Sequence, residues 1–173
     1  ENGTESDMLF RSLEKAMLAD GYDITERLSR TDKTANACLE DDILHGYIYV
    51  LRSSSISQWN QENLYKIGHT TSTVLQRIKN AKSQSTYLFG DVTVVKTYRC
   101  LNISSNHVEK ILHDFFAAAR LDIELTDPKG ESYYPREWFV VELELLDEAI
   151  SLLLENRLGD FFYDARSKQI VAI

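Results

Sequence analysis

Two neighbouring stretches decide the fold of this chain: Gly46-Tyr47-Ile48-Tyr49-Val50-Leu51 and Leu64-Tyr65-Lys66-Ile67-Gly68-His69-Thr70. Aromatic and β-branched residues dominate both, which is typical of strands, and the polar residues 53–63 between them predict a hairpin with a long loop. Apolar residues then recur at helical spacing, so the sequence predicts a helix over residues 73–82, capped by Ser72 or Thr73. Arg77 lies about one turn into this helix, where its side chain can reach back over the sheet.

The rest of the chain predicts further elements of a mixed fold. We expect a strand over residues 92–100, a helix over 104–120, an extended segment over 137–141 and a helix over 143–155. Together these elements predict an α/β (α+β) domain with a small central antiparallel sheet of about three strands flanked by helices.

The domain is expected to have appendages at both ends. We place a helical extension and linker at residues 1–42, the domain itself at 43–158, and a tail at 159–173 that is a candidate hairpin. Because the chain begins at Glu1 and not at a methionine, we also expect an additional N-terminal domain that this chain lacks.

The net charge of −8 is unevenly distributed along the chain. Residues 46–102 hold 2 acids and 7 bases, whereas residues 1–45 hold 11 acids and 5 bases, and residues 103–173 hold 14 acids and 7 bases. The basic segment therefore predicts a local footprint for a nucleic-acid backbone. Its candidate contacts are Arg52, Lys66, Arg77, Lys79 and Lys82, with Lys96 and Arg99 nearby. The alternative is that these are solvated surface charges.

Other features of the composition restrict the class of protein. No run approaches the roughly 20 apolar residues that a membrane span needs, and nothing resembles a signal peptide. Cys38 and Cys100 are far apart and have no second Cys or His at metal-ligand spacing. They indicate free thiols in a reducing compartment, and we expect a cytoplasmic protein without a membrane partner.

Four motifs in order resemble those of the GIY-YIG nucleases. The first two are the strand pair, with Tyr-Lys-Ile-Gly as the second motif, followed by a helix that bears Arg77. The others are Val108-Glu109-x-x-Leu112-His113-x-Phe115-Phe116 and Arg136-Glu137-Trp138-Phe139-Val140, which are similar to those of the phage and bacterial subgroup. The resemblance covers roughly residues 46–141 and implies a GIY-YIG-like fold and metal-dependent cleavage of DNA.

The resemblance also implies catalytic roles for particular residues. Glu109 would hold one divalent cation, Mg²⁺ or Mn²⁺, because such a hard cation needs only one or two carboxylates beside water and substrate phosphate. Tyr49 would activate or orient the attacking water, and Arg77 would hold the scissile phosphate with its planar fork. Lys66 would share the phosphate or lower the pKa of Tyr49, and His69 would bind a phosphate or relay a proton.

Each assignment has a structural alternative. Glu109 and Arg77 could be exposed helix residues, Tyr49 a half-buried strand aromatic, and Lys66 a surface charge. For the histidines, the alternative is a purely structural role. The supporting candidates are Tyr47, on the same strand face as Tyr49, and His113, one helical turn after Glu109. We interpret His113 as a core histidine, Trp138 and Phe139 mainly as core, and Glu137 as a weak candidate for the metal.

The leading hypothesis is therefore a metal-dependent endonuclease that hydrolyses phosphodiester bonds in DNA, in phage defence, a mobile element or repair. RNA is not excluded as the substrate, and the oligomeric state is left open. The alternative is a catalytically weak nucleic-acid-binding or assembly module on the same fold. Alternation along the strand also predicts that Tyr65 points away from Tyr49 and the candidate site.

Overall fold

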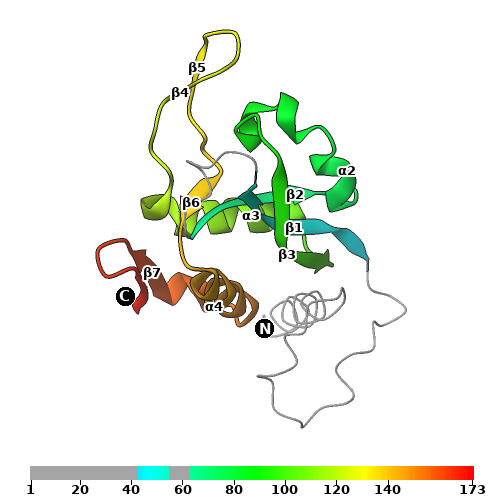
Figure 1. Cartoon of the computed structure of the whole chain (residues 1–173). Coiled ribbons are helices and arrows are strands. Elements are labelled where there is room, and N and C mark those ends of the chain that lie inside the picture. Colours follow the sequence, from blue (N-terminus) through cyan, green and yellow to red (C-terminus); the bar gives the residue numbers. More distant parts are fainter. Residues whose placement is uncertain (1–42, 55–62) are drawn as a thin grey trace.

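The computed structural model describes residues 43–54 and 63–173 (Figure 1). The expected helical extension over 1–42, Cys38 and most of the loop between the first two strands lie outside these residues. Four strands form the central antiparallel sheet in the order β3-β1-β2-β6. They are β1 (Leu44–Ser53), β2 (Leu64–Thr70), β3 (Val92–Leu101) and β6 (Trp138–Val140). The predicted α+β class is confirmed, and the sheet has one strand more than the expected three because the segment around Trp138 pairs with β2.

Among the described residues, three helices pack on this sheet: α2 (Val74–Ile78), α3 (Ser105–Phe115) and α4 (Leu143–Leu154). Side chains of α3 and α4 bury one face, together with Ile48 and Val50 of β1. On the opposite face, Tyr49 and Leu51 pack with α2 and the 3₁₀ turns that follow it. Because alternate residues of a strand point to opposite sides, β1 contributes to two separate clusters. We call these sides the core face, which carries α3 and α4, and the site face, which carries Tyr49.

The predicted helix over 73–82 is wrong in its length. Thr73 does cap the helix, since its side chain accepts a hydrogen bond from the backbone N–H of Gln76, but α2 ends at Ile78. Two short 3₁₀ turns, Ala81–Ser83 and Ser85–Tyr87, replace the rest. The Ser83 hydroxyl and the Gln84 amide both donate to the Asn80 carbonyl. Such local bonds from polar side chains compete with a continuous helix.

The second predicted helix is also shorter than expected, for a different reason. Ser104 caps α3 by accepting from the backbone N–H of His107, but the helix ends at Phe115 and gives way to a 3₁₀ turn at Ala117–Ala119. The aromatic Phe116 is fully buried at this point and packs against Tyr163, which fixes where the chain leaves the helix.

Two small hairpins complete the described residues. The strands β4 (Leu125–Thr126) and β5 (Ser132–Tyr133) form one within the loop 121–135, which the sequence did not predict. It projects from the sheet at the top of Figure 1. The other consists of β7 (Phe161–Asp164) and β8 (Gln169–Ala172), at the position of the candidate hairpin in the tail. The proposed division into domain and appendages is still a prediction.

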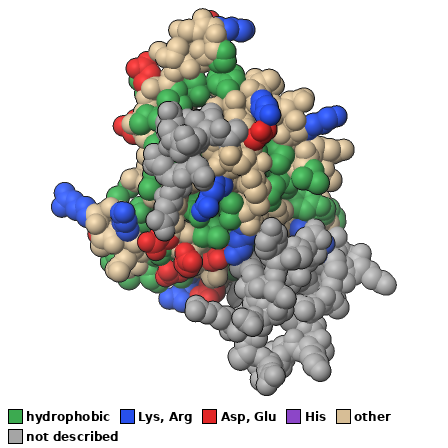
Figure 2. Space-filling model, viewed as in Figure 1, with side chains coloured by type: hydrophobic (Ala, Val, Ile, Leu, Met, Phe, Trp, Pro, Cys, Tyr) green, Lys and Arg blue, Asp and Glu red, His purple; other side chains and the backbone are tan. Residues whose placement is uncertain are grey.

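Acidic side chains gather over α4 in the view of Figure 2, whereas lysine and arginine side chains are spread more widely. The four exposed acids on and beside this helix are Glu142, Glu144, Glu148 and Glu155. Within the described residues, none of the helices is long and apolar enough to cross a bilayer.

Candidate active site

Tyr49 lies at the centre of the site face and is almost fully buried, with 1% of its surface exposed. Its partner across the β1–β2 pair is Gly68, and a Cβ atom on Gly68 would lie 2.6 Å from the Tyr49 ring and hydroxyl. Glycine at this position therefore makes room for the phenol.

The Tyr49 hydroxyl lies 3.3 Å from that of Tyr87, whose own hydroxyl donates to the Arg77 carbonyl. Tyr49 thus directs its proton at Tyr87 and keeps its oxygen lone pairs for the solvent side. Burial, reinforced by this hydrogen bond, raises the pKa of Tyr49 well above its ordinary value. The phenol is consequently suited to orient a water molecule and poorly suited to deprotonate one.

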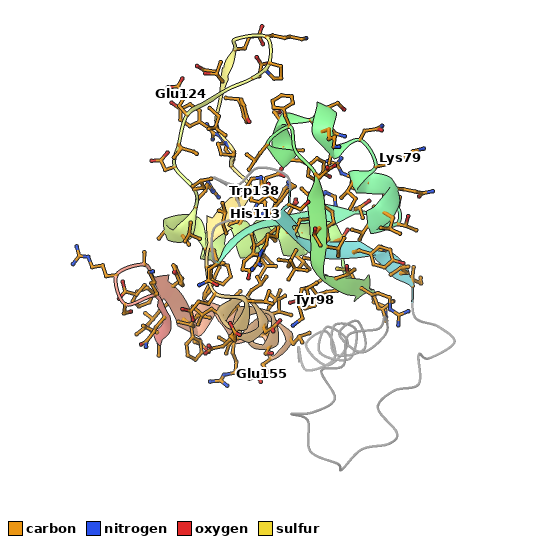
Figure 3. The ribbon with its side chains drawn as sticks, viewed as in Figure 1. Lys79, Tyr98, His113, Glu124, Trp138 and Glu155 are labelled. Atoms are coloured by element: carbon orange, nitrogen blue, oxygen red, sulfur yellow. The ribbon has the colours of Figure 1, made fainter. Side chains whose placement is uncertain are left out.

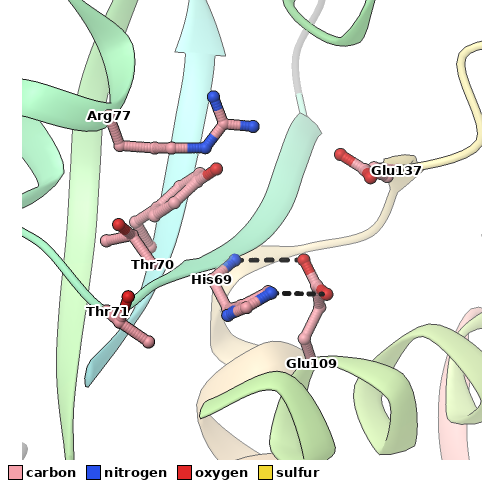
Figure 4. Close-up of a pocket in the computed structure, with 7 residues that line it drawn as sticks. His69, Thr70, Thr71, Arg77, Glu109 and Glu137 are labelled. Atoms are coloured by element: carbon pink, nitrogen blue, oxygen red, sulfur yellow. Dashed lines mark hydrogen bonds and ion pairs between the residues drawn. The ribbon is translucent and has the colours of Figure 1, made fainter. Parts of the chain in front are cut away.

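Arg77 approaches Tyr49 from α2. Its guanidinium lies over the Tyr87 ring, 5.3 Å from the centroid, and donates one hydrogen bond of 3.1 Å to Gln84. These contacts hold the planar group in one orientation. Most of its five N–H donors are not used by Gln84 and are left to bind a ligand. In Figure 4 the Arg77 side chain extends across the pocket in the direction of Glu137.

Glu109 and His69 form the opposite side of the same pocket (Figure 4). The Glu109 carboxylate, from α3, accepts a 3.0 Å hydrogen bond from the backbone N–H of His69. Its second oxygen lies 3.8 Å from His69 Nε2. Helix α3 is therefore attached to the end of β2 through a carboxylate that still faces open space, since Glu109 is 14% exposed.

The contacts of the His69 ring suggest which nitrogen carries a proton. Ser105 donates its single hydroxyl proton to the His45 carbonyl, and its oxygen lies 3.4 Å from His69 Nδ1. In that arrangement Nδ1 is the donor to Ser105, so a neutral ring has its lone pair on Nε2. That nitrogen lies 3.8 Å from the Glu109 carboxylate.

Lys66 is fully buried beneath the site face. Its ammonium forms an ion pair with Glu137 and donates to the Thr86 hydroxyl, which also contacts Glu137 at 2.7 Å. Burial lowers the pKa of Lys66, and the Glu137 charge offsets part of this change. For Glu137, burial would raise the pKa, but the attraction of Lys66 outweighs it and the pKa is lowered.

One open pocket of about 310 Å³ unites these groups. Strands β1 and β2 and helices α2 and α3 each contribute to it, and Glu137 closes one side just before β6. Its lining consists of Tyr49, His69, Thr70, Thr71, Arg77, Glu109 and Glu137. The structure thus brings four of the five predicted catalytic residues to one surface, and Lys66 lies directly behind Glu137.

Other candidate residues lie elsewhere. Tyr65 is on the core face, away from Tyr49 as alternation predicts, and its hydroxyl accepts from Arg52. Arg52 is therefore outside the pocket, and half-buried Tyr47 does not line it either. The His113 ring donates to the Ile67 carbonyl, which supports the structural interpretation of this histidine (Figure 3).

The lysines of the predicted footprint are also separated from one another. Lys79 is exposed at the outer end of α2 (Figure 3). Lys82 pairs with Asp91 at 2.9 Å on the surface. Lys96 instead donates to Asp147 of α4 at 2.6 Å. Arg77 is thus the cation of this set that reaches the pocket.

Sequence reasoning underestimated Glu137 and missed Tyr87 and Thr86. Glu137 reaches the pocket because β6 pairs with β2 in a register that sets Trp138 opposite Lys66. A signal was present, since Arg136-Glu137-Trp138 was recognised as a motif. Tyr87 and Thr86 lie in a polar segment with no motif of their own.

The oxygen and nitrogen atoms that line the pocket fit a hard cation better than a soft one. Among residues 43–54 and 63–173, no group of three or more His, Cys, Asp or Glu side chains is arranged to enclose a metal. Glu109 and Glu137 both line the pocket with Arg77, but Glu137 is already paired with Lys66 and Thr86, whereas Glu109 is held only by contacts with His69. That suits Mg²⁺ or Mn²⁺, which retain several waters and add substrate phosphate, whereas structural zinc requires four protein ligands.

Comparison with known proteins identifies the family. The T5orf172 domain matches residues 46–154, which is more than half of the chain, so the chain belongs to the T5orf172 domain family. T5orf172 is a different family from GIY-YIG, and the assignment to the GIY-YIG nucleases is therefore wrong. T5orf172 domains are nuclease-like or DNA-binding in some contexts.

A relative from Bacillus subtilis (strain 168), described as "Uncharacterized protein YeeC", is 42% identical over 152 residues. The alignment covers 87% of this chain but only 39% of that protein. The chain thus spans well under half the length of this relative. No solved structure matches the chain.

Proposed function

We propose that this domain is a metal-dependent endonuclease that hydrolyses phosphodiester bonds in DNA. The observation that carries the proposal is the convergence of Tyr49, His69, Arg77 and Glu109, from four different elements, on one solvent-open pocket. A phosphodiester hydrolase needs an oriented water, a proton acceptor and positive charge at the phosphate. These side chains supply each requirement, and the T5orf172 family is compatible with this chemistry.

Glu109 is the residue proposed to hold the divalent cation. A bound Mg²⁺ or Mn²⁺ would neutralise the charge that develops on the phosphate and would lower the pKa of a water molecule bound to it. The hydrogen bond from the His69 backbone fixes one Glu109 oxygen, and each carboxylate oxygen has a further lone pair for a ligand.

The protein groups divide the remaining tasks. Arg77 binds the scissile phosphate through guanidinium donors that Gln84 leaves unused. The Tyr49 oxygen accepts a hydrogen bond from the attacking water and orients it. His69 Nε2 takes the proton of that water as the new P–O bond forms, with Glu109 stabilising the resulting positive charge. The leaving oxygen departs from phosphorus and receives a proton from solvent.

A second candidate function is a DNA-binding or assembly module with little turnover. One observation favours it: Lys66 is fully buried in an ion pair with Glu137 and does not reach the Tyr49 hydroxyl to lower its pKa. Under this alternative, Arg77 would bind a backbone phosphate while the water remains unactivated.

A cleavage assay separates the two functions. Supercoiled plasmid, single-stranded DNA and RNA are incubated with the protein in Mg²⁺, Mn²⁺ or EDTA. The same series is run with Glu109→Gln and with Glu148→Gln as the matched control, because Glu148 is an exposed acid on α4. Cleavage that needs the cation and Glu109 but not Glu148 supports the nuclease. DNA binding without cleavage in either metal supports the binding module.

A further inference from the structure

A second, smaller cavity adjoins the candidate site on the far side of Glu137. We infer that it is a subsite for one unpaired nucleobase, next to the phosphate that Arg77 binds. This inference rests on the proposed function, because it assumes a nucleic-acid strand in the first pocket. The observations that carry it are the shared wall, the aromatic side chains and the distribution of charge around the β4–β5 hairpin.

The two cavities share one wall. Glu137 lines both, and its carboxylate accepts from the Thr86 hydroxyl, which belongs to the second cavity. The second cavity measures about 190 Å³, and its other side is formed by Tyr133, Tyr134 and Pro135. A strand held by its phosphate in the first pocket therefore has this cavity within reach of the adjacent nucleotide.

The cavity has a rigid frame. The Trp138 indole donates to the Thr86 carbonyl at 3.0 Å, and Tyr133 packs edge-on against Phe89 with ring centroids 5.7 Å apart. The hairpin turn is closed by Asp127, whose carboxylate accepts from the backbone N–H groups of Lys129 and Glu131 at 2.8 Å. A preformed aromatic site loses less conformational entropy when a ligand binds.

Tyr134 supplies the surface on which a base would stack. It is 51% exposed and comes directly after β5, which ends at Tyr133, and both tyrosines line the cavity. The neighbouring Arg136 is exposed as well. Bases that leave a duplex typically stack on tyrosine rings or on arginine guanidinium planes, and this stacking tolerates any base.

Charge favours a base over a duplex backbone at this position. Glu124, near the start of β4, is exposed and visible on the outer side of the hairpin in Figure 3, and Glu131 is exposed at the turn. These acids oppose the approach of a continuous row of phosphates. The hairpin should therefore not lie along a duplex. An unpaired nucleotide can insert its base while its phosphate stays at Arg77.

Fluorescence of 2-aminopurine tests the inference directly, because stacking on an aromatic ring quenches it. DNA hairpins with one unpaired 2-aminopurine, and matched hairpins in which it is paired, are titrated with the protein in EDTA so that no cleavage occurs. The variants are Tyr134→Ala, Tyr134→Phe, which retains the ring, and Phe162→Ala. The last is the matched control, because Phe162 is 47% exposed on β7, outside the cavity.

We expect quenching only with the unpaired probe. Tyr134→Ala should abolish it and weaken binding of that probe about 5- to 150-fold, the range for loss of one stacked base. Tyr134→Phe and Phe162→Ala should behave like the wild type. Quenching and affinity that survive Tyr134→Ala, or an equal loss for paired and unpaired probes, would overturn the inference while leaving the proposed nuclease intact. If the wild type binds neither probe, the proposed function fails as well.

Discussion

The two faces of the central sheet are built from the same strands but serve opposite purposes. On the core face, Ile48, Val50 and Ile67 pack with α3 and α4 and are fully buried. On the site face, the positions between them hold Tyr49, Lys66 and Gly68. Lys66 is as deeply buried as Ile67, its neighbour in the chain. Burying an ammonium costs free energy, whereas burying an isoleucine gains it.

This difference indicates which face stabilises the fold. Apolar packing on the core face stabilises the domain enough to offset the free-energy cost of burying a polar network on the site face. On the site face, the Lys66–Glu137–Thr86 network positions Glu137, and Tyr87 positions both Tyr49 and Arg77. Changes on the core face should therefore act on the free energy of unfolding, whereas changes at Arg77 and Glu109 should act mainly on chemistry. The Lys66–Glu137 pair contributes to stability as well.

The largest effect is expected for Glu109→Gln on the rate of DNA cleavage. We expect a decrease on the order of 10²- to 10³-fold or more, because the neutral amide loses the charge that attracts the cation. DNA affinity in EDTA and the melting temperature should change little, since Arg77 and the fold are unaffected. Single-turnover cleavage and fluorescence anisotropy measure the two quantities. Lost affinity with retained turnover would contradict the assignment.

Phe139→Ala should give the largest loss of stability. Phe139 is fully buried on the core face, where its ring packs with His113 and Arg120. Truncation of such a ring costs about 3–5 kcal/mol. Val140→Ala is the matched control in the same strand, because Val140 is 38% exposed and should cost about 0.5 kcal/mol. Urea denaturation measures both, and equal losses would contradict the proposed asymmetry between buried and exposed positions.

A smaller loss is expected when the ion pair between buried Lys66 and partly exposed Glu137 is broken. Glu137→Gln leaves the Lys66 ammonium buried without its counter-charge, at a cost of about 1–3 kcal/mol. The double variant Lys66→Met/Glu137→Gln should recover part of this loss, because no buried charge is left. A double variant no more stable than Glu137→Gln would show that the pair carries no specific coupling.

The same pair predicts a pH dependence of stability. Because the pKa of Glu137 is lowered in the folded protein below its ordinary 4.5, its contribution is fully present above that pH. The contribution is lost as the pH falls through the lowered value. Urea midpoints of the wild type should therefore decrease more steeply below pH 4.5 than those of Glu137→Gln.

Alternation along the strands could be predicted from the sequence, and it correctly assigned Tyr49 and Tyr65 to opposite faces. The cap of α2 was narrowed to Ser72 or Thr73, the polar residues before an apolar periodic run, and the structure has Thr73 as the cap. Local patterns of this kind depend on neighbouring residues only.

Features that depend on distant pairing could not be predicted in the same way. Glu137 reaches the pocket through β6, 71 residues after Lys66, and no local pattern reveals that register. The burial of Lys66 likewise depends on Thr86 and Glu137, which come from two other segments. The family assignment was wrong although it rested on four motifs in order, because the T5orf172 domain is the family that matches residues 46–154.

The smallest expected effect concerns the salt dependence of DNA binding. Each phosphate contact on duplex DNA contributes about 0.9 to the slope of log affinity against log salt. Arg77→Ala should flatten this slope by about one contact, because its guanidinium faces the pocket, and it should also slow cleavage. Lys82→Ala should change the slope by less, since Asp91 already neutralises that ammonium at 2.9 Å, and should leave cleavage unchanged. Affinity titrations between low and moderate salt distinguish the two variants. If Lys82→Ala flattens the slope as much as Arg77→Ala, the contacts with DNA phosphates extend over the surface of α2 and the turns that follow it. The DNA-binding surface would then be wider than the pocket.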